Sequence, residues 1–331
     1  MPMILSSKIT RRPADWAFAS GTAAALEPEL LSRPFFEALL KSRDRSEARA
    51  ALGKSPYRAL FPDDKSLDAA SGVIDAKAKE IKAGIFKLCP PHLLENFFGI
   101  PDRFRTFRTL FGQAARQGNP QGADLEPLFT AFAVEPSFAD ELDGHRNRLF
   151  QSNPVQSANA VERSLYLDSA ACSLMLVVAR RAPEKLVRQY MRDRSLLSAW
   201  ACVFRSRWNG VPAETIRSWF IYDGGCELAS ALLGTEQDPR AVASCRLSSA
   251  SAGILDSIEP ARIKADIDCA ASDILRDTVL SCRLVSFGAE RILSYLVAIE
   301  AELVNLELCL GSIANGIDRD ITHSRLRREY A

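Results

Sequence analysis

The amino-acid sequence predicts an all-α protein. Apolar residues recur at steps of three and four along almost every patterned segment, and the alternation typical of strands is short and rare. Alanine, leucine, arginine and glutamate, which favour helices, dominate these segments. Glycine and proline mostly fall between them, where helices are expected to end.

The individual helices have recognisable ends. Ser32 precedes RPFFEALLKS as a predicted N-cap, and Pro34 is tolerated in a first turn. The strongest pattern lies in YLVAIEAELVNLELCLGSIANG at 295–316, which ends at the predicted glycine cap Gly316. Asp318 or Asp320 is expected to cap a last helix, ITHSRLRREY. One apolar seam runs along the long helix, through Ile292, Leu296, Ile299, Leu303, Leu306 and Leu310, and a second face carries Leu293, Val297, Val304 and Leu308.

Three segments share one layout and predict three similar helical domains. Each has an acid early in a first helix, then a break, then a long helix with an aromatic residue near its start and a glycine at its end. The acids are Asp75, Asp168 and Asp268, the aromatics are Phe97, Tyr190 and Tyr295, and the glycines are Gly118, Gly210 and Gly316. Boundaries fall where glycine and proline collect, near 117–123 and 209–214. The predicted domains are 1–118, 119–210 and 211–331.

Composition narrows the classes of partner. The 331 residues include 42 basic and 41 acidic side chains, so the net charge of +1 gives no electrostatic reason to bind nucleic acid or an anionic membrane. The eight cysteines form no C-x-x-C pair, which predicts free thiols in a reducing compartment. No signal peptide is visible, and the longest apolar run, AACSLMLVVA at 170–179, is too short for a membrane span. We therefore expect a soluble chain.

The sharpest candidate for catalysis is FPDDKSLD at 61–68. Asp63, Asp64 and Asp68 spell D-D-x-x-x-D, a pattern with which all-α isoprenoid synthases hold magnesium and a diphosphate. The alternative is an ordinary turn and helix start, because Pro62 and two acids suit the first turn of a helix. A synthase also needs a second metal-binding helix, and ADIDCAASD at 265–273 lacks that pattern. The turn is the favoured interpretation.

Other candidate motifs are weaker. FIYDGGCEL at 220–228 contains a glycine pair but lacks phosphate-loop spacing, so a turn between helices is favoured. RFRTFRTLF at 103–111 interleaves basic and aromatic residues, which we interpret as a helix with an aromatic inner face rather than a nucleic-acid surface. His92, His145 and His323 show no arrangement for catalysis or zinc. We expect no catalytic residue, no cofactor and no metal.

Three carboxylates in the long apolar helix require another explanation. Glu300 and Glu307 fall between its two apolar faces, and Glu302 lies on the other flank near Asn305. An unpaired buried charge is costly, so these acids need partners. We interpret them as residues that hold the helix in register or pair with a partner.

The same stretch resembles the C-terminal pattern of the C subunits of the rotary V-type and A-type ATPases, a family whose eukaryotic members are called d subunits. The family pattern is close to Y-L-x-x-K-E-x-E-x-x-N-L-R and ends in N-G. The matching residues are Tyr295, Leu296, Glu300, Glu302, Asn305, Leu306, Asn315 and Gly316. Ile299 and Glu307 stand where the family usually has Lys and Arg. DWAFASGTAAALEPELLSRPFFEALL, SEARAALGKSPYRALF with Tyr57, and FIYDGGCEL resemble further family segments in order.

The resemblance implies a fold and a role. The fold is a funnel of three similar helical domains about a pseudo-threefold axis. The role is non-catalytic: such a protein lies on the cytoplasmic face of the membrane proteolipid ring, holds the D and F subunits of the axle, and passes torque between the ring and the ATPase head. The structural or partner-pairing candidates are then Glu300, Glu302, Asn305, Tyr295 and Gly316.

Overall fold

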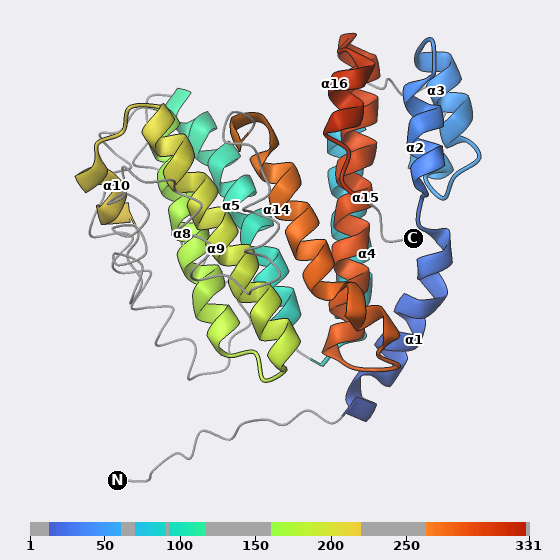
Figure 1. The fold of residues 1–331 in the computed structure, drawn as a ribbon, viewed down its shortest axis with the longest axis horizontal. Helices are drawn as coiled ribbons and strands as arrows, with labels where there is room; N and C mark the ends of the chain where they lie inside the picture. The colour runs from blue at the N-terminus through green and yellow to red at the C-terminus, as the bar shows by residue number, and fades with distance from the viewer. Residues whose placement is uncertain (1–12, 61–69, 91–92, 117–159, 220–262, 329–331) are drawn as a thin grey trace. The chain divides into compact units, whose positions relative to one another are not determined.

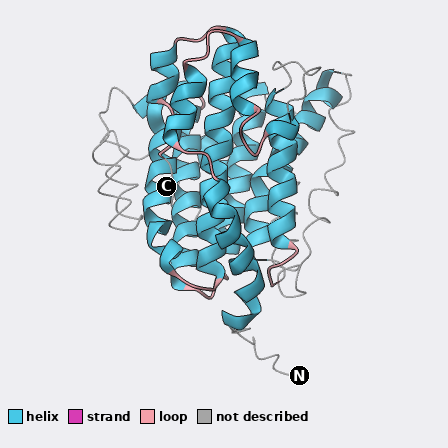
Figure 2. Ribbon diagram, turned by 90° about the vertical axis from the view of Figure 1, so that its right-hand side faces the viewer, coloured by secondary structure: helices cyan, strands magenta, loops and turns pink. Residues whose placement is uncertain are grey.

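The structure is a computed structural model that describes residues 13–60, 70–90, 93–116, 160–219 and 263–328. Within these ranges every regular element is a helix and there is no strand, which confirms the predicted all-α class (Figure 2). The chain separates into two compact units. Unit 1 contains Met1–Pro91 and Glu259–Ala331, and unit 2 contains His92–Ile258.

Unit 1 is built around the long C-terminal helix α15, Ala289–Asn315 (Figure 1). Its packing partners come from both parts of the sequence: α1 (Ala17–Leu26), α2 (Arg33–Leu40), α3 (Arg45–Leu52), α4 (Ala70–Phe86), α14 (Ile263–Val279) and α16 (Arg319–Ser324). Four short 3-10 helices complete the described part of the unit: η1 (Pro13–Trp16), η2 (Glu27–Glu29), η3 (Arg58–Leu60) and η6 (Leu280–Leu284). The first and last parts of the sequence therefore fold as one body.

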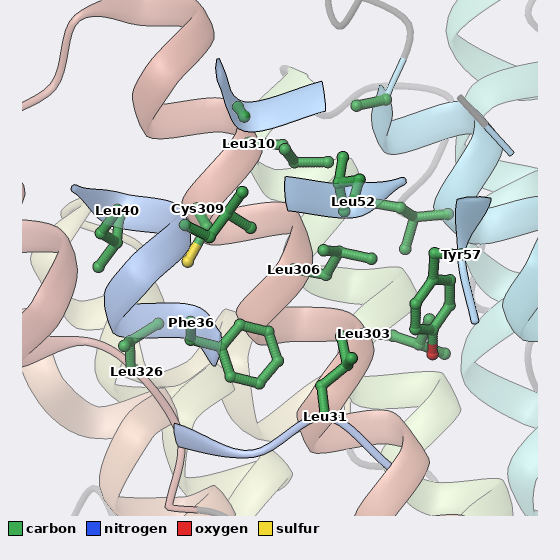
Figure 3. Close-up of a cluster of buried hydrophobic side chains, with 14 of the residues drawn as sticks. Leu31, Phe36, Leu40, Leu52, Tyr57, Leu303, Leu306, Cys309, Leu310 and Leu326 are labelled. Carbon is green, nitrogen blue, oxygen red and sulfur yellow. The ribbon is translucent and has the colours of Figure 1, made fainter. Parts of the chain in front are cut away.

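The predicted apolar seam of α15 is the centre of this core. All six of its residues are buried, from Ile292 to Leu310. Figure 3 shows its second half meeting side chains of α2, α3 and the segment around Tyr57. Leu31, Phe36, Leu40, Leu52 and Leu326 close the cluster. The second predicted face is buried at Leu293 and Val297 and only partly buried at Val304 and Leu308.

The ends of α15 and α16 are fixed by local chemistry. Gly316 has φ +63°, a left-handed conformation that favours glycine, and the N–H of Ile317 donates to the carbonyl of Ser312 at 3.0 Å. The predicted glycine cap is confirmed. Asp318 caps α16 through its side chain, as one of the two predicted caps. Ser32 occupies the predicted N-cap position of α2, but its hydroxyl makes no capping bond.

Unit 2 contains α5 (Leu93–Arg116), α8 (Ala160–Arg180), α9 (Lys185–Trp208) and α10 (Ala213–Trp219). The run AACSLMLVVA lies in α8 and is buried against its neighbours rather than continuing into a longer apolar helix. Phe97 and Phe98 of α5 pack on Tyr190 of α9, with ring centroids 6.4 and 6.3 Å apart. The guanidinium of Arg194 lies 5.0 Å from the centre of the Phe98 ring, which adds a cation–π contact to this core.

The three predicted repeats remain a prediction. Asp75 lies in α4 of unit 1, whereas Phe97, its counterpart in the same repeat, lies in α5 of unit 2. Gly210 follows α9 with φ +73°, as a helix-ending glycine should, and Gly118 lies outside the described residues.

Candidate functional site

The candidate site begins at Glu302, which is 6% exposed in the middle of α15. Its Oε2 accepts a hydrogen bond from the backbone N–H of Leu31, two residues before α2 begins. Its Oε1 accepts a hydrogen bond from the hydroxyl of Tyr57. A carboxylate that accepts with both oxygens offsets much of the cost of its burial. Glu302 therefore fixes two N-terminal segments on the C-terminal helix.

Glu300 and Glu307, two further acids of α15, reach α4. Glu300 Oε1 lies 2.8 Å from the ammonium of Lys82, and both side chains are largely withdrawn from solvent. The hydroxyl of Ser71 donates to Glu307 Oε1 at 2.5 Å. These contacts lie at two levels of the α4–α15 interface, so they fix the register of one helix on the other.

Asn305 holds the residues that follow α16. Its Oδ1 accepts from the N–H of Arg327 at 2.6 Å, and its Nδ2 donates to the carbonyl of Arg327 at 3.0 Å. The next residue, Arg328, pairs with Asp273 and Asp277 of α14 at 3.0 and 2.9 Å. The end of the described chain is therefore bound to both α14 and α15.

Tyr295 lines a cavity of about 420 Å³ within unit 1. Its walls are formed by α1, η2, α4 and α15, together with Pro56 and Tyr57. The apolar lining is Leu26, Leu30, Ile81, Ile85, Leu88 and Ile299, and the ionisable or polar lining is Thr22, Glu29, Tyr57, Lys77, Glu80, Tyr295 and Glu302. This volume and this mixture of surfaces are typical of sites for small molecules.

Burial and nearby carboxylates raise the pKa values of both tyrosines that line the cavity. Burial, followed by the charges of Glu302, Glu29 and Glu27, raises the pKa of Tyr295 to about 12. Burial and then Glu302 raise the pKa of Tyr57 well above its usual value. Both phenols therefore stay protonated at neutral pH, and Tyr57 can donate to Glu302.

Several sequence candidates do not join this site. Asp63, Asp64 and Asp68, the glycine pair of 220–228, His92 and His145 all lie outside the described residues. His323 lies on α16, with its Nε2 3.5 Å from Glu37 Oε1. Cys172, Cys202, Cys282 and Cys309 are buried, Cys89 and Cys269 are half-buried, and none of these six described cysteines forms a disulfide bond. In the described ranges no group of three or more His, Cys, Asp or Glu side chains could hold a metal ion.

Sequence reasoning missed the partner of Glu300. Lys82 shares the buried side of α4 with Ile74, Ala78 and Ile85, and a lone lysine in an apolar stripe signals a buried acid opposite. It also missed the cavity, because Tyr57 and Tyr295 are far apart in sequence and no local pattern joins them.

Comparison of the chain with protein-family models and with curated proteins finds no match. Among the described helices, none combines the length and the apolar character that crossing a bilayer demands.

Proposed function

We propose that this chain is a non-catalytic central-stalk component of a rotary V-type or A-type ATPase. In this role it is peripheral to the cytoplasmic side of a membrane and links the proteolipid ring to the D and F subunits of the axle. It transmits torque for proton or sodium transport coupled to ATP synthesis or hydrolysis. The proposal includes the funnel of three helical domains about a pseudo-threefold axis.

One observation carries the proposal. The polar residues that match the family's C-terminal pattern each brace a different segment on α15. Glu300 holds Lys82 of α4, Glu302 holds Leu31 and Tyr57, and Asn305 holds Arg327. A pattern whose polar residues serve internal bracing suits a mechanical part more than a catalytic one.

The physical requirements of torque transmission agree with this use of the residues. A rotor element has to resist bending and twisting, which demands dense packing and polar contacts that fix helix register. In unit 1 the seam of α15 supplies the packing, and the three acids supply contacts of fixed geometry. Such a part needs no reactive group.

Affinity purification of the tagged full-length chain from its native cells, in mild detergent, tests the proposal. Mass spectrometry should identify the ring proteolipid, the D and F subunits and the ATPase head among the bound proteins. Glu302→Ala should reduce the recovery of D and F, because it removes the hydrogen bonds that hold Leu31 and Tyr57 on α15. The surface control Glu214→Gln should not reduce it. If none of these proteins is recovered with the wild-type chain, the proposal is wrong.

The sequence offers a catalytic alternative, a magnesium-dependent enzyme resembling isoprenoid synthases that uses Asp63, Asp64 and Asp68. No observation in the described residues favours it. Should the purification recover none of the ATPase components, an assay of diphosphate release with magnesium, using Asp64→Asn as the control, is the next experiment.

A further inference from the structure

The hairpin formed by α8 and α9 carries a concentration of positive charge where the two helices are joined. Figure 1 shows the helices side by side, and the turn lies between the end of α8 at Arg180 and the start of α9 at Lys185. Residues 180–192 contain five basic side chains against one acid, Glu184, a local excess of +4. The net charge of +1 for the whole chain conceals this local excess.

Three of these cations, Lys185, Arg188 and Arg192, form what we call the basic stripe. Their spacing of three and four residues places them on one side of α9, and all three residues are exposed. Val187 and Met191, on the other side of the same turns, are fully buried. The packing of α9 therefore fixes the direction in which the basic stripe faces.

Among the described residues no acid pairs with the basic stripe. The guanidinium of Arg188 donates to the backbone carbonyl of Ala182 at 2.8 Å, which leaves its charge in place. The neighbouring acids Glu184 and Asp193 have contacts of their own, and Asp193 is buried. Cations in the first turns of a helix oppose the helix dipole, so helix stability does not account for the basic stripe.

We propose that the basic stripe docks on the anionic lipid headgroups of a membrane surface. A negatively charged leaflet attracts basic residues through its surface potential, which is worth about fivefold in affinity for each Lys or Arg near the surface. The inference rests on the proposed function in one respect, because that function puts the chain beside the cytoplasmic face of a membrane. The basic stripe is then a contact with the lipid itself.

The side chains around the basic stripe favour a lipid surface over other anionic partners. A protein interface usually has apolar or aromatic anchors at its core, and no large hydrophobic side chain of residues 180–192 is exposed. Proteins bind single-stranded nucleic acid with aromatic side chains on which bases stack, and Tyr190, the aromatic residue of this segment, is buried. An anionic bilayer attracts the stripe through charge alone.

Co-sedimentation of the full-length chain with lipid vesicles tests the proposal. In about 0.05 M salt, phosphatidylcholine vesicles with roughly 30% phosphatidylserine should bind at least about tenfold more tightly than pure phosphatidylcholine vesicles, which carry no net charge. Raising the salt to about 0.5 M should abolish the binding, because salt screens exposed charges. Equal binding to both kinds of vesicle, or binding that salt does not weaken, overturns the proposal. Tighter binding to a DNA duplex of about 20 base pairs overturns it as well.

Paired variants locate the contact on the chain. Lys185→Gln combined with Arg192→Gln removes two cations of the basic stripe and should weaken binding to the anionic vesicles about 25-fold. Lys41→Gln combined with Lys54→Gln removes two exposed cations of unit 1 and is the matched control, which should bind as the wild-type chain does. An equal loss in the two double variants would mean that only the total charge matters, and it overturns the assignment to the basic stripe.

A charge-conserving variant tests whether charge carries the contact. Lys185→Arg combined with Arg192→Lys keeps both cations and should bind the anionic vesicles as tightly as the wild-type chain. Because both side chains are exposed, circular dichroism should show unchanged helix content in every variant. A folded charge-conserving variant that no longer binds the vesicles contradicts docking through charge.

The vesicle experiment contains no ATPase subunit, so its result is separate from the test of the proposed function. Failure to bind anionic vesicles overturns the lipid contact and leaves the outcome of the affinity purification unchanged. A chain that binds the vesicles through the basic stripe but recovers no ATPase component has the lipid contact without that assembly.

Discussion

The carboxylate of Glu302 accepts a hydrogen bond from the hydroxyl of Tyr57, 245 positions earlier in the chain. The same carboxylate accepts the N–H of Leu31, 271 positions earlier. Long separations make such contacts costly in chain entropy before they form. Once the helices pack, the buried side chain of Glu302 joins the first and last segments of unit 1. We therefore expect its loss to lower the stability of the whole unit.

Removing either partner should destabilise unit 1. Tyr57→Phe deletes a bond to a charged acceptor and should lower the free energy of unfolding by about 2 kcal/mol. Glu302→Ala leaves both the Tyr57 hydroxyl and the Leu31 N–H without a partner, so its cost should be roughly twice as large. Urea denaturation followed by circular dichroism measures both effects.

The control for this pair is Glu29→Gln, which changes an exposed carboxylate of the same unit and should shift the midpoint little. If Glu302→Ala unfolds at the same urea concentration as the wild-type chain and also keeps any axle binding, the contacts of Glu302 with Leu31 and Tyr57 are not important to the fold or to the proposed assembly.

The Lys82–Glu300 pair should behave as a coupled unit. Lys82→Met leaves Glu300 partly buried beside an apolar side chain, and Glu300→Leu leaves Lys82 in the same position. Each single change should cost about 1–3 kcal/mol, whereas the double variant should recover most of this, because two packed apolar groups often replace a buried ion pair without loss. A double-mutant cycle by urea denaturation measures the coupling energy, and strictly additive costs would show that the two charges do not interact.

Part of this arrangement was predictable from local sequence. The 3–4 spacing from Ile292 to Leu310 predicted both the helix and its buried side, because a helical period records which face meets the core. Gly316 and Asp318 were predictable as caps, because capping depends on neighbouring residues alone. The need of Glu300 and Glu302 for partners also followed from their apolar surroundings.

The identity of those partners was not predictable in the same way. Lys82, Leu31 and Tyr57 meet α15 only because α1, α2 and α4 pack on it, and a single sequence does not record which helices pack together. The cavity beside Tyr295 depends on the same packing. One sequence signal was available, the lone Lys82 on the apolar side of α4, and it indicated an acidic partner without indicating which one.

Alkaline solution should destabilise unit 1 through its buried thiol and phenol groups. Burial raises the pKa of the Cys309 thiol to about 12, and burial with Glu302 raises that of Tyr57. Because the pKa values are raised in the folded protein, the unfolded chain loses these protons at lower pH than the folded chain, near pH 9 for the thiol and pH 10 for the phenol. Their contribution is therefore complete below those values and falls as the pH rises toward the folded-state values, with a slope of up to about 1.4 kcal/mol per pH unit for each group.

Urea denaturation at a series of pH values from 8 to 11 measures this slope. Cys309→Ala removes one of the titrating groups, so its stability should start lower, because it leaves a small cavity, but decline less steeply above pH 9. A decline of equal steepness in the variant and the wild-type chain would mean that the thiol ionises as easily in the folded protein as in the unfolded one.

One glycine lies inside α15 and another lies at its end. Replacing each with alanine should change the free energy of unfolding in opposite directions. Gly316 has φ +63°, and a Cβ atom added there would meet nothing within 4 Å, so Gly316→Ala should cost about 1 kcal/mol from backbone strain alone. Gly311 lies inside the helix, also with nothing within 4 Å, so Gly311→Ala should stabilise by about 0.5–1 kcal/mol. Thermal and urea denaturation of both variants give the two signs. Because the substitutions are identical and only five residues apart, a shared sign would mean that α15 does not end at Gly316 in solution.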